Sequence, residues 1–200
     1  MVNLHGMISK GKEIEKDKII LGVDPGTTIM GYGLIHIQKS KISLLQFGVI
    51  HLSKYSNHGL KLSKIFERVV QLIDEYHPDE MAIESPFYGK NVQSMLKLGR
   101  AQGVAIAAAI SREVPICEYA PKKVKQSVTG NGNASKEQVS SMLCNLLKIQ
   151  EAPKLFDATD ALAVALCHHF QGGSLKVQSG NWSSFLKDNP DRIVSGKKNN

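Results

Sequence analysis

The sequence predicts an α/β fold whose sheet begins antiparallel and continues parallel. Three segments predicted as strands come first and are joined by short turns, as in an antiparallel meander. Helical and extended segments then alternate along the chain, which is typical of helices that connect parallel strands. A chain of 200 residues with 42% hydrophobic residues is long and apolar enough for one domain with an ordinary core.

The predicted meander occupies the first quarter of the chain. A strand over 18–23 (KIILGV) ends at the turn Pro25-Gly26. Two further strands are predicted over 30–37 and 42–52, with the turn QKSK between them. Asp24 therefore stands alone between an apolar strand and a tight turn. A carboxylate is costly there if it is buried without a partner, and cheap if it faces water, a cation or a ligand.

The rest of the chain alternates between helical periodicity and short apolar runs. In the first helix, apolar residues recur every three to four positions. Ser135 and Gln138 have the spacing of a capping box and mark the start of a later helix. A seam of small residues around Gly99 and Gly103 predicts close packing of the long central helix. The predicted elements are helices over 60–76, 92–112, 120–128, 135–147 and 157–170, and strands over 80–83 and 114–119.

Composition predicts three regions: an N-terminal flexible extension over 1–18, a folded domain over 19–171, and a basic, disordered tail over 172–200. The extension contains no apolar core of a signal peptide, and no apolar run approaches the roughly 20 residues that span a membrane. The three cysteines form no CxxC motif, so we expect free thiols in a reducing cytoplasm.

The net charge of +7 is concentrated locally. Between Tyr119 and Lys136 the chain carries four lysines and no acid, which makes this stretch a candidate anion-binding edge. The alternative is an ordinary solvated loop that happens to be rich in lysine.

Four carboxylates lie at the ends of predicted elements. Asp24 and Glu84 each follow an apolar strand, and Asp157 and Asp160 share one face at the start of the last helix. If the two strands are neighbours, all four acids can converge, and their mutual repulsion would then require cations. A cluster of oxygen ligands without Cys or His suits Mg²⁺ or Mn²⁺. Two such ions are the usual means of phosphodiester displacement.

Each acid also has a plain structural interpretation. Asp24 could simply start a turn, and Glu84 could be a solvent-facing strand end. Asp157 could be a helix N-cap, with Asp160 stabilised by the helix dipole. The joint pattern is more specific than any single member.

The order and spacing of several motifs resemble the RuvC-type Holliday-junction resolvases. The motifs are GVDPGT, GYG, AIESPF, GKNVQS, LKLGRAQGVAI, EYAPKKVKQSVTGNGNASKEQV and DATDALAVALCH, and together they cover residues 18–171. The resemblance implies an RNase H-like fold, a five-stranded mixed sheet of order 3-2-1-4-5 flanked by helices. It also implies a homodimer that acts in the cytoplasm, with the branch-migration proteins RuvA and RuvB as partners.

The resemblance also assigns residues. Asp24, Glu84, Asp157 and Asp160 match the family's catalytic acids, which implies two Mg²⁺ per subunit, replaceable by Mn²⁺. Some relatives have His at the position of Asp157, so the Asp here implies an all-oxygen site. The implied reaction is symmetric paired nicking of a Holliday junction, giving 5′-phosphate and 3′-hydroxyl ends.

Further residues match positions that contact DNA in the family. Phe87 corresponds to an aromatic that stacks on bases at the crossover, although a core Phe at the sheet end is the alternative. Lys125 and Lys136 match lysines near the scissile phosphate, and Lys136 is the candidate for stabilising its charge. Lys122 and Lys123 are candidate backbone contacts.

Two other functions remain open on the sequence. DPGTT resembles the first phosphate loop of actin-like ATPases, but the chain is short for two such domains and no second copy is evident. The second alternative function is a non-catalytic junction-binding module, and the intact set of four acids argues against it. His168 and His169 are adjacent on a predicted helix, so their side chains point in different directions and do not form a pair of metal ligands. We interpret them as residues near the helix C-terminus that the helix dipole favours.

Overall fold

The computed structural model describes residues 17–39, 41–86, 91–150 and 156–172. Within these ranges the chain forms a mixed sheet in the order β3-β2-β1-β4-β5, which confirms the predicted order. Central strand β1 pairs antiparallel with β2 and parallel with β4. The strands are β1 Lys18–Asp24, β2 Ile29–Gln38, β3 Lys41–His51, β4 Glu80–Glu84 and β5 Ile116–Tyr119.

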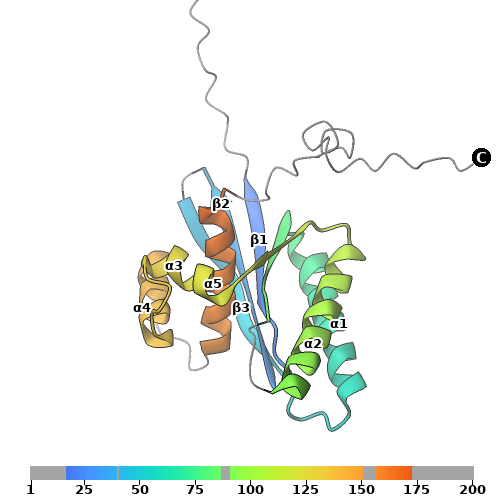
Figure 1. The fold of residues 1–200 in the computed structure, drawn as a ribbon. Coiled ribbons are helices and arrows are strands. Elements are labelled where there is room, and N and C mark those ends of the chain that lie inside the picture. Colours follow the sequence, from blue (N-terminus) through green and yellow to red (C-terminus); the bar gives the residue numbers. More distant parts are fainter. Residues whose placement is uncertain (1–16, 40, 87–90, 151–155, 173–200) are drawn as a thin grey trace, which may run out of the picture.

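Helices cover both faces of the sheet (Figure 1). Helices α1 and α2 pack on one face, whereas α5 lies on the other with α3 and α4 beside it. The helices are α1 His58–Tyr76, α2 Val92–Ile110, α3 Pro121–Thr129, α4 Lys136–Leu147 and α5 Phe156–Phe170.

Alternating side chains of β1 build the two halves of the core. Leu21 and Val23 face α1 and α2, whereas Ile20 belongs to the cluster that packs around α5. Between them, Gly22 has no side chain, and a Cβ there would lie 2.1 Å from the Ala161 carbonyl oxygen. The glycine therefore lets the backbone of α5 lie directly on the central strand.

Two predicted boundaries shift at the turn between α2 and β5. The helix ends at Ile110 rather than 112, because the Arg112 amide bonds to the Ala109 carbonyl oxygen (3.0 Å) and tightens the last turn. Glu113 then adopts a left-handed conformation (φ 58°), and β5 begins at Ile116 rather than 114. These are end effects of a tight turn that apolar periodicity does not encode.

The predicted small-residue seam of α2 is only partly correct. Ala101 and Ala105 are buried against the core, but a Cβ added at Gly99 or Gly103 would meet nothing within 4 Å. The two glycines lie on the outer side of the helix, so they do not serve packing within the described fold.

The predicted extension, the cysteines and the expected lack of a membrane helix can each be compared with the described residues. Strand β1 begins at Lys18, the last residue of the predicted extension. Residues 1–16 of that extension lie outside the described residues, as does the tail from 173 onward. Cys117, Cys144 and Cys167 are free thiols. In the described part of the chain, the search for a helix both long and apolar enough to cross a membrane finds none.

Candidate active site

Asp24 and Glu84 lie side by side at one end of the sheet. Asp24 is the last residue of β1 and Glu84 the last of β4. The two strands are parallel neighbours with Val23 opposite Ile83, so the residues that follow, Asp24 and Glu84, reach the same edge of the sheet. Both acids are half-buried.

Helix α5 brings two more acids to this edge. Asp157 lies in the first turn of α5, and Asp160 follows three residues later. Gly31 pairs with Asp24 across β1 and β2, and a Cβ on Gly31 would lie 1.8 Å from the Asp157 carbonyl oxygen. The glycine thus allows the start of α5 to lie over the end of β1, a role that its place in GYG did not reveal.

Three of the four acids share one cavity of about 290 Å³. Asp157 does not line it, although its charge acts on Asp24. The residues lining the cavity are Asp24, Glu84, Pro121, Val124, Lys125, Lys136, Val139, Asp160 and Ala163.

The carboxylates crowd one another electrostatically. Burial, with added repulsion from Glu84 and Asp160, raises the pKa of Asp24 well above its ordinary value. Burial and the charge of Asp160 raise the pKa of Glu84 to about 7. Burial is the larger cause of both shifts, and repulsion between the acids adds to it.

Lys136 supplies part of that charge. Its ammonium nitrogen lies 2.5 Å from Asp160 Oδ2. Burial alone lowers the pKa of Lys136, but the hydrogen bond and charge of Asp160, together with other acids, raise it. Lys136 is the first residue of α4, whose start is fixed by the predicted capping box of Ser135 and Gln138.

The other predicted DNA-contacting residues differ in position. Lys125 lines the cavity, and its Nζ donates to the Ala134 carbonyl oxygen (2.9 Å). Lys122 and Lys123 are exposed on α3 and do not line the cavity. Phe87 lies outside the described residues.

The chemistry of the cavity fits a hard divalent cation. Its anionic groups are carboxylates, whose oxygens such cations prefer, and a bound cation would stabilise the ionised form of Asp24 and Glu84 that burial and mutual repulsion disfavour. Among the described residues, however, no three acidic, His or Cys side chains form a ready metal-binding group. The contact between Lys136 and Asp160 is consistent with this, because the ammonium group occupies a carboxylate that a metal would need.

Gln102 is a supporting residue that the sequence did not reveal. This side chain of α2 is buried, and its amide nitrogen donates to Glu118 Oε2 (2.7 Å) and more weakly to the Glu84 carbonyl oxygen (3.5 Å). It therefore connects α2 to the ends of β4 and β5. A polar residue within a run of small apolar residues was the available signal.

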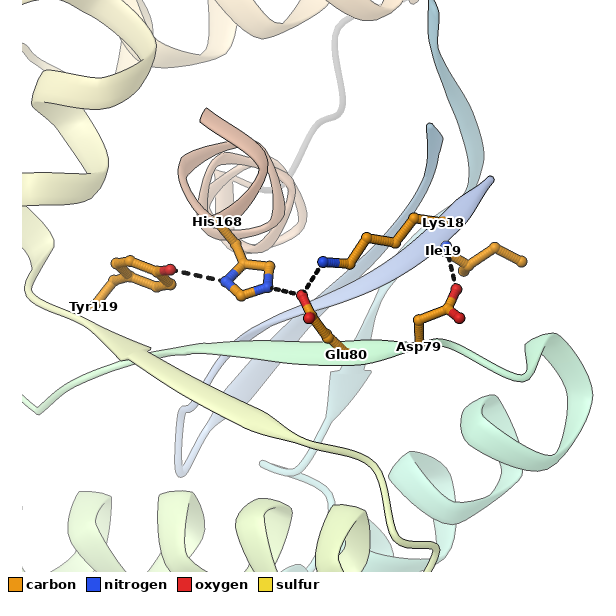
Figure 2. A network of polar contacts seen from close by, with 6 residues as sticks. All are labelled: Lys18, Ile19, Asp79, Glu80, Tyr119 and His168. Carbon is orange, nitrogen blue, oxygen red and sulfur yellow. Dashed lines mark hydrogen bonds and ion pairs between the residues drawn. The ribbon is translucent and has the colours of Figure 1, made fainter. Parts of the chain in front are cut away.

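A buried polar network anchors the far end of α5 (Figure 2). The Nδ1 atom of His168 is hydrogen-bonded to the Tyr119 hydroxyl (2.8 Å), and its Nε2 atom contacts Glu80, which also pairs with Lys18. His168 is completely buried, and burial lowers its pKa. His168 and His169 lie in the last turn of α5, as predicted, but the buried contacts of His168 are a structural role that the sequence did not reveal.

A mixed sheet of order 3-2-1-4-5, with acids at the ends of its first and fourth strands and on its last helix, is the architecture of RNase H-like nucleases. The family model "Crossover junction endodeoxyribonuclease RuvC" matches residues 20–168. Proteins of that name from Cytophaga hutchinsonii and Christiangramia forsetii are 68% and 57% identical; the alignments cover 94% and 93% of this chain and 94% and 100% of theirs.

Solved structures agree with the sequence comparisons. Thermus thermophilus RuvC in complex with Holliday junction substrate matches with a TM-score of 0.73 and 33% identity, over 78% of this chain and 94% of that one. The chain belongs to the RuvC family of crossover junction endodeoxyribonucleases. Of the functions that the sequence left open, membership of this family favours the nuclease over an actin-like ATPase or a non-catalytic module.

Proposed function

We propose that this protein resolves Holliday junctions by paired, symmetric nicks that leave 5′-phosphate and 3′-hydroxyl ends, in recombination and repair. The observation that carries the proposal is the convergence of Asp24, Glu84 and Asp160 with Lys136 in one cavity. Membership of the family supports it, and the neighbouring Thermus thermophilus protein was solved with such a junction.

Nucleases of this family typically depend on Mg²⁺. Asp24, Glu84, Asp157 and Asp160 would hold two ions per subunit, with Mn²⁺ as a substitute. The bound ions would supply Lewis-acid activation of the attacking water and stabilisation of the leaving 3′-oxygen.

Lysine side chains of the protein bind the phosphates of the DNA in this proposal. Lys136 leaves Asp160 and donates to the scissile phosphate, whose negative charge grows during displacement. Lys125, held by Ala134, keeps a second positive charge at the cavity wall. Lys122 and Lys123 on α3 contact the DNA backbone beyond the cavity, and Phe87 stacks on bases at the crossover.

Symmetric nicking requires two sites related by a two-fold axis, so the proposed enzyme is a homodimer. The outer side of α2 offers a suitable surface. Val92, Leu96 and Ile110 are 64%, 52% and 62% exposed, and Gly99 and Gly103 lie open between them. Successive members are four, three, four and seven residues apart, which places them along one helix face, where a second α2 can approach closely. The proposal includes action in the cytoplasm and cooperation with RuvA and RuvB.

The test is cleavage of a synthetic four-way junction. Mg²⁺ and Mn²⁺ should support cutting, whereas Ca²⁺ should support binding with little cutting, because its looser coordination positions the reactants poorly. Sequencing-gel mapping should place the two nicks symmetrically across the crossover. Cutting in EDTA, or cutting of linear duplex at the same rate, would contradict the proposal.

A further inference from the structure

A second cavity, of about 430 Å³, lies on the opposite face of the sheet from the carboxylates. Tyr32 of β2 points into the core on the α1 side, and its neighbour Gly31 pairs with Asp24. Both cavities therefore adjoin the same end of the sheet. The lining residues are Tyr32, Val49, Ile50, His51, Lys54, Tyr55, Lys64, Glu67, Arg68 and Gln71.

Positive charge predominates in this second cavity. Lys54, Lys64 and Arg68 line it together with one acid, Glu67. Lys64 pairs with Glu67, with 2.5 Å between Nζ and Oε2. Lys54 and Arg68 show no ion pair with a carboxylate in the described part of the chain, so the cavity keeps an excess of positive charge.

Arg68 is held in place without being neutralised. Its guanidinium lies 4.9 Å from the centre of the Tyr32 ring and donates to the Tyr32 hydroxyl (2.8 Å) and to Gln71 Oε1 (2.8 Å). These bonds use one hydrogen of each terminal nitrogen, and the remaining N–H groups show no acceptor among the described residues. A fixed, charged fork of donors is the group that proteins use to bind phosphate.

The cavity is connected to the rim of the carboxylate site. Lys61 precedes Lys64 and Arg68 by one and two turns of α1, on the same side of the helix. Its Nζ donates to the Thr27 carbonyl oxygen (3.2 Å), in the segment that directly follows Asp24. Lys61, Lys64 and Arg68 therefore form a row of cations on α1 that leads from this segment to the second cavity.

We propose that the Arg68 cavity binds a backbone phosphate of a junction arm, away from the crossover. The proposal rests on the junction-cutting function above and extends it to a surface on the other side of the sheet. A polyanion that reaches Asp24 and continues past Lys61 meets Arg68 and Lys54 next. The cavity suits a free mononucleotide less well, because Arg68 already covers the face of the Tyr32 ring on which a base would stack.

The test compares Arg68→Met and Lys54→Gln with wild type in junction binding at several salt concentrations, in Ca²⁺ to limit cutting. Arg68→Met should weaken binding roughly tenfold and reduce the slope of log K against log salt by about 0.9, the value of one phosphate contact. Lys54→Gln should change the slope in the same direction. Lys41→Gln is the matched control, since Lys41 is an exposed lysine at the other end of β3 and should bind as wild type.

Arm length separates this site from the crossover contacts. Shortening the junction arms until duplex no longer reaches the cavity should make wild type and Arg68→Met bind equally. Arg68→Lys keeps the charge but loses the fork and should fall between the two. Thermal melts establish that each variant is folded, and Lys54→Gln, at an exposed position, tests the charge without disturbing Tyr32.

Several results would overturn the proposal. Unchanged affinity and salt slope in both Arg68→Met and Lys54→Gln would do so, as would a defect that persists on short arms. Thermal stabilisation of wild type, but not of Arg68→Met, by inorganic phosphate or AMP without any change in junction binding would assign the cavity to a small anion. Wild type that fails to cut junctions would instead contradict the proposed function.

Discussion

His168 and Glu80 form a buried contact that joins the last turn of α5 to the first residue of β4 (Figure 2). Asp157 and Asp160 lie at the other end of the same helix, and Glu84 at the other end of the same strand. The contact therefore fixes, from a distance, the two elements that carry three of the four acids.

Loss of this contact should destabilise the whole fold. We expect His168→Gln to lower the free energy of unfolding by on the order of 1–3 kcal/mol, because it leaves Glu80 and the Tyr119 hydroxyl incompletely bonded. Tyr119→Phe removes only the hydroxyl and should cost less, about 0.5–1.5 kcal/mol. Urea denaturation monitored by circular dichroism measures both. Equal stability of all three proteins would contradict a structural role for the network.

The same histidine should make stability depend on pH. Burial lowers the pKa of His168, so the unfolded chain takes up a proton at this group more readily than the folded protein. The contribution of neutral His168 is thus complete above its unfolded pKa of about 6.5 and declines as the pH falls through the lower folded value. His168→Gln should flatten this part of the stability curve. A curve of unchanged shape would assign the acid sensitivity to other groups.

The four acids should be needed for cutting but not for binding. Asp24→Asn, Glu84→Gln, Asp157→Asn and Asp160→Asn should each abolish junction cleavage while affinity stays near wild type, because phosphate contacts elsewhere supply most of the affinity. Gel-shift and cleavage assays on one labelled junction measure both. Glu113→Gln is the control, an exposed acid in the turn before β5. Cleavage by Asp24→Asn would place the reaction elsewhere.

The sequence predicted the elements and the acids because each leaves a local pattern. Alternation and helical periodicity located the strands and helices, whereas the sheet order was implied by the resemblance to RuvC-type resolvases. Asp24 and Glu84 were recognisable because each follows an apolar strand directly.

Other features depend on contacts between distant segments. The bond between Lys136 and Asp160 joins α4 to α5, and the contact of Gly31 with Asp157 joins β2 to α5. The contacts of His168 were not predicted because its two partners, Glu80 and Tyr119, are 88 and 49 residues away in the chain. The Arg68 cavity likewise forms only when α1 packs beside β3.

The proposed dimer should depend on the outer side of α2. Leu96→Glu places a charge in the middle of the apolar stripe and should yield a monomer in sedimentation analysis, with loss of paired nicking. Lys97→Glu, one residue along and also exposed, makes a larger change of charge away from the stripe and should remain dimeric. A dimer that survives Leu96→Glu would exclude this surface as the interface.

Phe87 lies outside the described residues, so its role remains a prediction from the sequence. Phe87→Leu keeps similar apolar volume, so a core role predicts a stability cost below about 1.5 kcal/mol and normal cutting. Stacking on bases predicts normal stability and much slower cutting, since Leu offers no aromatic face. A junction with unpaired bases at the crossover should restore much of the rate, because less unstacking remains to be done. A lower melting temperature with normal cutting per folded molecule would assign Phe87 to the core.

Glu84 should destabilise the metal-free protein at neutral and alkaline pH. Burial and the charge of Asp160 raise its folded pKa from 4.5 to about 7, so the folded state holds the proton more tightly than the unfolded chain. The stability that this proton provides is complete below the unfolded pKa and is lost as the pH rises through about 7. Glu84→Gln stays uncharged, and in EDTA at pH 8 it should exceed wild type by on the order of 1–3 kcal/mol.

The pH dependence distinguishes this effect from a general change in packing. At pH 5 the difference in stability should be much smaller, since Glu84 is then protonated in the folded state and the stability lost above pH 7 is largely retained. Saturating Mg²⁺ at pH 8 should shrink or reverse the difference, because a ligand that binds the folded carboxylate stabilises wild type. Urea titrations at pH 5 and 8, with and without Mg²⁺, give the four comparisons, and Glu113→Gln should follow wild type in each. An advantage of the same size at pH 5 and pH 8 would mean that the carboxylate's charge is not its cause.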